Sequence, residues 1–467
     1  MRYRIALWAL IILFVLICSM WLASTHIHSA ILKRVLCLEQ DHALFELWKD
    51  RPHIMYRKFY FFNITNSEAF LSGSRMNVDE VGPITYSLEW LKTGFHWHDT
   101  RNMTYRRSES LRFVPEMSCV NQSAVIYTFN ASMIENSDPT GSQDLNDSKF
   151  LIVKASIRQL MHETGDEPSS FSWLNKIICS KGGFYTIHTG KETNRCLNYI
   201  REYNKWKLTD LEDEDVAIIK RSSIELGPSL SLKDIHFKFF KTELCRCMTF
   251  IRNVTEEING LDNIRFEISS HINGFGNLEN DLKTACNVSS NNHCCPSNPV
   301  VISLPHFFSV ESPDVWLPGL NPNETIHNSF VNVEPVTGLT TKFSMRYQFN
   351  VKLNGVKYRE RVPTGTYPAF WVDDSGTCSK ECDDFLLYYV RIPYYVMHSK
   401  VSWTIFFILG VWISINIILL LFCRQKNEPE FKEGIPLLSG AALREYLKVN
   451  YKELNKSFED CKFEDEC

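Results

Sequence analysis

The chain has 467 residues, of which 44% are hydrophobic and 22% are charged, and its formal net charge is −4. This composition fits a folded protein large enough for more than one domain, and the acidic balance gives no reason to expect a nucleic-acid partner. The sequence contains no G-x-S-x-G, no H-E-x-x-H and no phosphate-cradling glycine loop. We therefore expect no enzymatic activity, no cofactor and no bound metal.

Two long apolar runs lie near the ends of the chain, at Ile5–Ala23 and Val401–Cys423, and neither contains a charged residue. Both reach the roughly 20 residues that a helix needs to cross the hydrocarbon core of a bilayer. The first run could also be a cleaved signal peptide, because Arg2 and Arg4 supply a basic start. Its apolar stretch is longer than usual for a signal peptide and no clear small-x-small cleavage site follows, which favours an uncleaved membrane anchor.

Positive charges flank both runs on the sides that face the chain ends: Arg2 and Arg4 precede the first, and Arg424 and Lys426 follow the second. Because cytoplasmic flanks carry an excess of Lys and Arg, both termini are predicted to be cytosolic. The predicted organisation, in chain order, is a cytosolic N-terminus, a transmembrane helix, a lumenal or extracellular domain, a second transmembrane helix and a cytosolic tail, at residues 1–4, 5–23, 24–400, 401–423 and 424–467.

Glycosylation sequons and cysteines support this topology. Eight Asn-x-Ser/Thr sequons fall between the two apolar runs, at Asn63, Asn102, Asn121, Asn130, Asn146, Asn253, Asn287 and Asn323. A ninth, Asn455, lies in the predicted cytosolic tail, where it would not be used. Eleven of the fifteen cysteines also lie between the runs, as expected of an oxidising compartment.

Most of the segment between the runs has the composition of short β-strands. The stretch SAVIYTFNASM and the stretch TTKFSMRYQFNVKLNGVKYRERV mix β-branched and aromatic residues with polar ones. In the second stretch, Asn354-Gly355 predicts a type I′ hairpin turn. Helical periodicity is limited to a few places, including residues 40–49 and 147–163. The sequence predicts an antiparallel β-rich domain with inserted helices.

Residues 147–163 are predicted to form a helix that Asp147 caps. Its apolar residues fall on one stripe, made by Phe150, Val153, Ile157 and Leu160. Lys154, Arg158 and His162 step by four residues on another face. These three are candidates for contact with an anionic lipid, a lipoprotein or an acidic protein partner, and the alternative is a solvated polar face.

Several blocks together resemble the class B scavenger receptor family. They are RKFYFFNITNSEAFLSG with VDEVGPITYSLEW, HDTRNMTYRRSESLRFVPEMS, residues 299–338, and YPAFWVDD at 367–374. The resemblance covers nearly the whole chain and keeps the order of the blocks. It implies an α+β membrane protein: two transmembrane helices flanking a large lumenal antiparallel β-barrel, with an apolar tunnel and a helical-bundle cap.

The same resemblance implies that the protein binds and transfers lipids such as cholesterol, fatty acids or lipoprotein lipid. Two alternatives remain open, namely a trafficking receptor for a lysosomal hydrolase and a cell-surface scavenger or adhesion receptor. The chain departs from the family at Ser67, where proline is usual, and at Ile84, where an aromatic residue is usual. The apex region between 145 and 190 is also shortened, which leaves the ligand undetermined.

Cysteine pairing is only partly implied. Cys245 with either Cys294 or Cys295 matches one long family disulfide, the partner of Cys286 is open, and Cys196 is the nearest counterpart of an upstream family cysteine. Zinc is the rival interpretation of the cluster formed by Cys286, Cys294 and Cys295 with His293 and His306, but the irregular spacing favours disulfides. Cys378 and Cys382 in CSKEC loosely resemble a redox pair, and a structural bridge is favoured.

The tail holds a predicted sorting signal. Glu433, Leu437 and Leu438 in KEGIPLLSG form an acidic dileucine pattern, similar to the signal of the lysosomal integral membrane protein type 2 branch of the family. Such a peptide binds clathrin adaptors, and Gly434 and Pro436 keep it extended. We therefore expect an integral membrane protein of late endosomes or lysosomes rather than of the plasma membrane. Farther along, YLKV and YKEL fit tyrosine-type signals, or belong to an amphipathic helix on the inner leaflet.

Overall fold

The computed structural model describes most of the chain, at the residues given by the following ranges: 30–50, 52–130, 151–161, 182–204, 206–207, 223–230, 235–241, 246–269, 300–310, 316–353, 362–393 and 400–425, with residues 8, 11–15, 19, 26, 28, 244 and 395. Contacts divide the chain into two units. One unit is His28–Tyr394, and the other combines Met1–Ile27 with Tyr395–Cys467.

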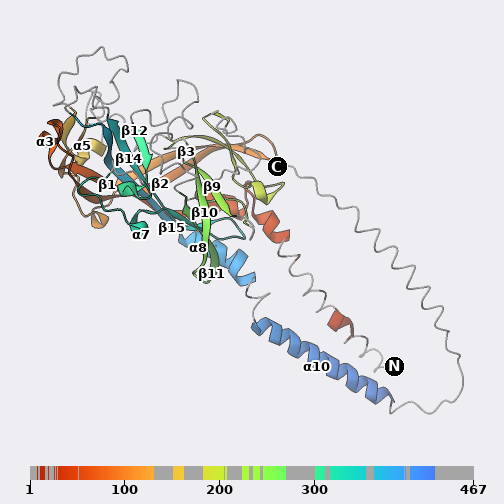
Figure 1. The fold of residues 1–467 in the computed structure, drawn as a ribbon. Helices are drawn as coiled ribbons and strands as arrows, with labels where there is room; N and C mark the ends of the chain where they lie inside the picture. The colour runs from red at the N-terminus through yellow and green to blue at the C-terminus, as the bar shows by residue number, and fades with distance from the viewer. Residues whose placement is uncertain are drawn as a thin grey trace, which may run out of the picture. The chain divides into compact units, whose positions relative to one another are not determined.

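Unit His28–Tyr394 is built on one large antiparallel sheet (Figure 1). Its strands follow the order β8-β7-β6-β3-β2-β1-β15-β14-β13-β11-β10-β9, and β12 pairs with β14. The strands are β1 (His53–Ile64), β2 (Val78–Trp97), β3 (Asn102–Phe113), β6 (Gly183–His188), β7 (Ile200–Tyr203), β8 (Trp206–Lys207), β9 (His236–Lys241), β10 (Arg246–Ile258), β11 (Leu261–Ile268), β12 (Val300–Ser303), β13 (Phe330–Val333), β14 (Thr340–Leu353) and β15 (Gly365–Cys378).

The sheet curls until its two ends approach each other. Tyr203 on β7 and Phe240 on β9 lie near opposite ends of the strand order, yet their ring centroids are 5.8 Å apart. The largest core cluster is packed by aromatic and aliphatic side chains from the part of the order that runs from β2 to β9; its fully buried members include Phe59, Ile84, Phe250, Phe266, Val331 and Phe349. The predicted antiparallel β-rich domain is confirmed, and the sheet is nearly barrel-shaped.

Short helices and a second sheet complete this unit. The helices are α2 (Ala43–Lys49), α3 (Ser67–Leu71), α5 (Ile157–Met161), α7 (Glu324–His327) and α8 (Lys380–Leu386), with 3-10 turns at Pro115–Met117, Asn194–Cys196 and Pro305–Phe307 and a π-helical turn at Leu387–Arg391. Strands β4 (Val125–Phe129) and β5 (Ile152–Ser156) pair separately. Helix α2 confirms the helix predicted at 40–49, and β4 confirms the strand predicted around Val125.

The helix predicted over 147–163 is wrong in its central part. Residues Ile152–Ser156 form β5, and the helix is limited to Ile157–Met161. In β5, Val153 pairs with Thr128 and Ile152 pairs with Phe129 of β4. Pairing with a distant strand outweighs the local helical periodicity, because β-branched residues favour strands when a partner is present.

The first strand of the hairpin predicted in residues 340–362 is confirmed as β14, which pairs antiparallel with β15. The predicted second strand falls on residues 354–361, outside the described residues, so the hairpin itself stays a prediction. The described register pairs Leu353 with Gly365. The predicted turn at Asn354-Gly355 lies outside the described residues.

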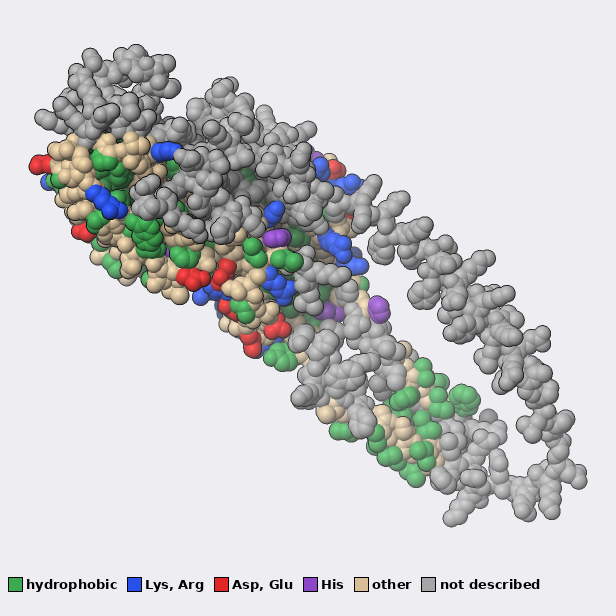
Figure 2. Space-filling view, in the orientation of Figure 1, with side chains coloured by type: hydrophobic (Ala, Val, Ile, Leu, Met, Phe, Trp, Pro, Cys, Tyr) green, Lys and Arg blue, Asp and Glu red, His purple; other side chains and the backbone are tan. Residues whose placement is uncertain are grey.

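In the unit that holds the chain ends, helix α10 spans Lys400–Gln425 and covers the second predicted membrane span. Hydrophobic side chains gather along it (Figure 2), and those most exposed include Ile405, Ile408, Trp412 and Leu419. In the described part of the chain, no helix is both long enough and apolar enough to cross a membrane. The two transmembrane helices therefore stay predictions.

Candidate functional site

Two adjacent cavities lie between strands of the large sheet. The outer cavity has a volume of about 210 Å³ and is lined by His53, Ile54, Met55, Tyr56, Ser87, Leu88, Glu89, Trp90, Glu225 and Ser379. The inner cavity, of about 20 Å³, is lined largely by buried aromatic and aliphatic residues, among them Phe239, Phe240, Phe343 and Met345. Leu88 and Trp90 border both cavities. Their side chains therefore form the wall that the two cavities share.

The alternation of β2 explains why this wall is apolar. Leu88 and Trp90 are two residues apart and both are buried, whereas Leu91 is exposed. Successive side chains of a strand point to opposite faces, so Leu88 and Trp90 lie on the same face. The inner cavity has room for about one water molecule. A larger ligand requires these side chains to move.

A buried ionic network borders the inner cavity. The carboxylate of Asp374 on β15 accepts hydrogen bonds from Arg57 Nε at 2.6 Å and Arg57 Nη2 at 3.0 Å. It also accepts from Lys241 Nζ at 2.6 Å and from the Tyr347 hydroxyl at 3.0 Å. Arg57 and Asp374 are directly opposite each other in the β1–β15 register, which sets up the paired contact.

Further ion pairs extend the charged region. Glu109 lies 3.4 Å from Arg57 Nη1 and 3.4 Å from Arg107 Nη2, and the Arg107 guanidinium lies over the Trp90 ring at 4.3 Å. The side chains of Arg57, Glu109 and Arg107 are almost completely buried. An unpaired charge in such a buried position would destabilise the fold by several kcal/mol. The core therefore tolerates these charges only when all the partners in the network are present.

A second buried pair joins β2 to the segment before β9. Lys92 Nζ lies 3.0 Å from Glu225 Oε2 and donates to the Trp48 carbonyl at 2.7 Å. Burial lowers the pKa of Lys92, and the nearby Glu225 carboxylate opposes this shift. Glu225 also borders the outer cavity, where burial lowers the pKa of His53. His53 is therefore neutral at physiological pH.

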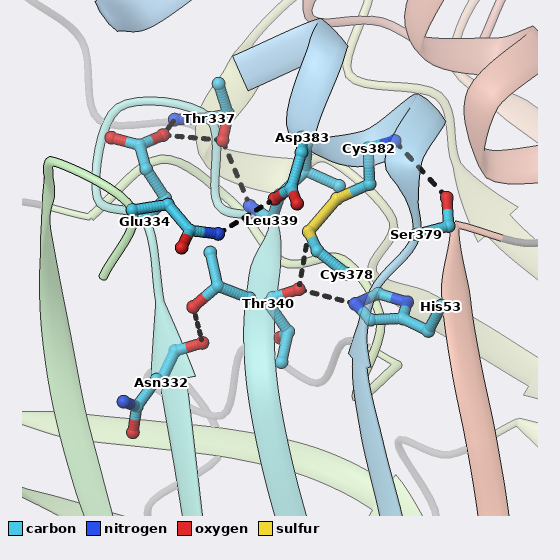
Figure 3. The surroundings of a disulfide bond; sticks show 12 residues. His53, Asn332, Glu334, Thr337, Leu339, Thr340, Cys378, Ser379, Cys382 and Asp383 are labelled. Carbon is cyan, nitrogen blue, oxygen red and sulfur yellow. Dashed lines mark hydrogen bonds between the residues drawn. A yellow bond between two sulfur atoms is a disulfide. The ribbon is translucent and has the colours of Figure 1, made fainter. Parts of the chain in front are cut away.

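A disulfide lies beside His53 and Ser379, two residues that line the outer cavity (Figure 3). Cys378 at the end of β15 is bonded to Cys382 in α8, so the two cysteines of CSKEC form a disulfide. Ser379 caps α8, because its hydroxyl accepts a hydrogen bond from the Cys382 amide at 3.3 Å. His53 and Ser379 both line the cavity, so the bridge holds the cavity wall against the start of α8.

A polar cluster surrounds His306, which the zinc alternative had included. Its Nε2 lies 2.7 Å from Glu80 Oε2, and its Nδ1 accepts from the Asn321 amide at 3.0 Å. Both ring nitrogens are therefore occupied. Trp371 Nε1 donates to the same Glu80 oxygen at 2.7 Å. Burial raises the pKa of Glu80, but the hydrogen bonds from His306 and Trp371 outweigh it and hold this pKa below its usual value. His327 stacks on His306, and burial lowers the pKa of His327 to about 4.

Comparison with known proteins decides the family. A sequence model of the CD36 family matches residues 7–423, which is most of the chain. The chain belongs to the CD36 family. This confirms the predicted resemblance to class B scavenger receptors.

Curated relatives of this CD36-family chain are distant but cover most of its length. Scavenger receptor class B member 1 of Mus musculus is 23% identical over 80% of this chain and 81% of its own. Lysosome membrane protein 2 of Homo sapiens is 24% identical over 82% and 88%. Sensory neuron membrane protein 2 of Manduca sexta is 23% identical over 75% and 80%.

The structure places six of the eight predicted glycosylation sites of this CD36-family chain. Asn121, Asn253 and Asn323 are exposed, and Asn63 and Asn102 are half-buried. Asn130 is only 9% exposed, which leaves little room for a glycan in the folded protein. Asn146 and Asn287 lie outside the described residues. Glycosylation at these sites stays a prediction.

The predicted ligand-binding stripe is not one helical face. Lys154 lies on β5 and Arg158 on α5; both are exposed, and His162 lies outside the described residues. The disulfide candidates Cys245, Cys286, Cys294 and Cys295 also lie outside them, as do Glu433, Leu437 and Leu438 of the sorting signal. Cys196 is disulfide-bonded.

Sequence reading missed the residues that shape the interior. Arg57 and Asp374 both lie inside blocks that carried the family resemblance, but nothing in the local pattern distinguishes a buried charge from a surface one. An available signal was the position of Asp374 just after the apolar run Pro368–Val372, where a charge that is drawn into the core needs a partner.

Proposed function

We propose that this protein is a scavenger-receptor-type membrane protein that binds lipid in the interior of its large β-sheet and transfers it. The observation that carries the proposal is the pair of adjacent cavities that share Leu88 and Trp90 within a nearly closed sheet. Membership of the CD36 family, with a scavenger receptor among the relatives, supports it.

The physical reason concerns apolar surface. Moving a sixteen-carbon chain through water exposes its apolar surface, at a free-energy cost of about 13 kcal/mol, or about 0.8 kcal/mol per CH₂ group. A path lined by side chains such as Phe239, Phe343 and Met345 shelters that surface and needs no catalytic group. The outer cavity, at about 210 Å³, is smaller than the roughly 300–1,000 Å³ of typical ligand pockets. Lipid therefore enters when the side chains of Leu88 and Trp90 move and open a wider passage between the two cavities.

Lipid transfer tests this function. Full-length protein reconstituted in vesicles should move a labelled sterol or fatty acid between donor and acceptor membranes. Met345→Trp should slow this transfer about tenfold or more, since an added barrier of about 1.4 kcal/mol is sufficient for that. Met345 lines the inner cavity, and the larger indole would fill it.

The matched control is Met117→Trp, the same substitution at an exposed methionine. This variant should transfer lipid at the wild-type rate. Thermal unfolding of both variants separates a blocked path from a misfolded protein. Wild-type transfer by a folded Met345→Trp variant, or no transfer of any lipid by the wild type, would contradict the proposed function.

The proposal includes two membrane anchors and an endosomal or lysosomal location. Support for the second anchor comes from α10, which coincides with the apolar run at 401–423. Support for the location comes from the acidic dileucine pattern at Glu433, Leu437 and Leu438 and from the lysosome membrane protein among the relatives. In this arrangement the tail is cytosolic, where clathrin adaptors can bind it.

Replacing Leu437 and Leu438 by alanine should move the protein from internal vesicles to the cell surface, because adaptor pockets bury the two leucines. The measurement is antibody staining of cells expressing a C-terminally tagged protein. An antibody to the large domain should label intact cells only for the double variant, and the tail tag should need permeabilisation in both. An unchanged location contradicts the sorting signal, and a tag accessible in intact cells contradicts the topology.

Escort of a lysosomal hydrolase is the alternative that the sequence left open. It depends on the predicted cap residues Lys154, Arg158 and His162; the first two are exposed, and His162 lies outside the described residues. The cavities favour lipid as the ligand instead.

A further inference from the structure

A thiol, a carboxylate and an imidazole meet on the segment that precedes α2, and none of the three residues lines either of the two cavities. Cys37, Glu39 and His42 each offer one ligand atom, and these atoms all lie within 4.8 Å of one another. The Cys37 sulfur is 2.9 Å from His42 Nδ1, and Glu39 Oε2 is 3.9 Å from His42 Nε2. None of the sequence patterns considered above includes this group.

Neighbouring contacts hold the segment in place. Leu36 and Leu38, on either side of Cys37, are almost completely buried. The Leu38 amide donates to the Thr189 carbonyl at 2.8 Å, and the indole of Trp97 donates to the Leu38 carbonyl at 3.1 Å. The backbone on both sides of the cysteine is therefore fixed, and the position of its sulfur is set by the fold.

A tight turn brings His42 back toward Cys37. Asp41 has a positive φ of 67°, and the His42 amide donates to the Glu39 carbonyl at 3.2 Å. His42 occupies the N-cap position of α2, but its side chain makes no capping hydrogen bond. It lies against the Cys37 sulfur instead. The ring is thus directed to the thiol rather than to the helix.

These three ligand types are the ones that zinc prefers: a thiolate, an imidazole nitrogen and a carboxylate oxygen. Zinc bonds of about 2.0–2.3 Å place tetrahedral ligands roughly 3.5 Å apart, so small side-chain rotations are enough to close the site. Glu39 and His42 are partly exposed, with 37% and 28% of their side chains accessible, which gives an ion a route to the buried sulfur.

We propose that Cys37, Glu39 and His42 form a zinc site with three protein ligands and one position open to water. Lys191 affects this site, because its ammonium lies 2.6 Å from Glu39 Oε1. This cation competes with the metal for the carboxylate and weakens binding. The site does not depend on the proposed lipid function.

Zinc binding tests the proposal on full-length protein purified without a histidine tag and treated with chelator. Competition with a chromogenic zinc chelator measures the dissociation constant of zinc alone. Cobalt substitution gives a second readout, because a cobalt–thiolate bond produces a charge-transfer band in the near ultraviolet. Wild type should bind the metal and show the band.

Cys37→Ser should abolish the cobalt–thiolate band and weaken zinc binding roughly 100-fold, and His42→Gln and Glu39→Gln should each weaken it roughly tenfold or more. Lys191→Met should strengthen it. The matched control is Cys119→Ser, which removes an exposed free thiol elsewhere in the described part of the chain and should change neither readout. Wild type without the band, or zinc binding unchanged in Cys37→Ser and Glu39→Gln, would overturn the proposal.

Discussion

Asp374→Asn is expected to lower the free energy of unfolding by about 3–5 kcal/mol, the usual effect of removing one partner from a buried ion pair. The carboxylate is almost completely buried and accepts hydrogen bonds from Arg57, Lys241 and Tyr347. An asparagine has no charge to balance the guanidinium and the ammonium, which then stay in the core with less compensation. Because typical proteins have only about 5–15 kcal/mol of stability, the loss is a large fraction.

Chemical and thermal unfolding of the full-length protein in detergent, followed by tryptophan fluorescence, measure this effect. Asp384→Asn is the matched control, since it makes the same chemical change at an exposed position on α8. It should change the free energy of unfolding by less than about 0.5 kcal/mol. Equal stability of the Asp374→Asn variant and wild type would show that the buried ionic network does not stabilise the fold.

Gly319→Ala is expected to cost about 2–5 kcal/mol, combining backbone strain with overpacking. Gly319 has φ of 96°, which side-chain-bearing residues rarely adopt. An added Cβ would lie 1.6 Å from the Val78 carbonyl oxygen. This contact is with backbone, and the Val78 amide is held by the Pro318 carbonyl at 3.1 Å, so neither side can easily move away.

Gly94→Ala separates the two causes. Gly94 also has a positive φ, of 65°, but an added Cβ there would meet nothing within 4 Å. Only the backbone conformation is penalised, so the loss should be about 1 kcal/mol. The same unfolding measurements apply to both variants. Similar losses at Gly319 and Gly94 would mean that the close approach to Val78 is relieved at little cost.

Several elements were predictable because their signals are local. Alternation of β-branched and aromatic residues predicted β4 and β14, and a short apolar period predicted α2. The blocks that carried the family resemblance keep their order along the chain, so the family was also recognisable from the amino-acid sequence alone. The same local reasoning failed at Ile152–Ser156, where the partner strand β4 lies more than twenty residues away and decides the conformation.

The candidate site was largely hidden for a similar reason. Leu88, Trp90 and Met345 look like ordinary core residues, and their role as cavity walls arises only when β2 and β14 face one interior. Cys37, Glu39 and His42 are close in sequence, yet their spacing matches no common metal motif. Their meeting depends on the turn at Asp41 and on the anchoring of Leu38 by Thr189.

The family, the β-rich class and the two apolar runs could be predicted from the amino-acid sequence, because these follow from composition and order along the chain. Which charges are buried, which glycine has no room for a side chain, and where the cavities lie became known only from the folded structure. Arg57, Lys241 and Asp374 come from three strands that are far apart in the sequence, β1, β9 and β15. Burial and pairing are properties of the surroundings, and distant segments supply those surroundings only when the chain has folded.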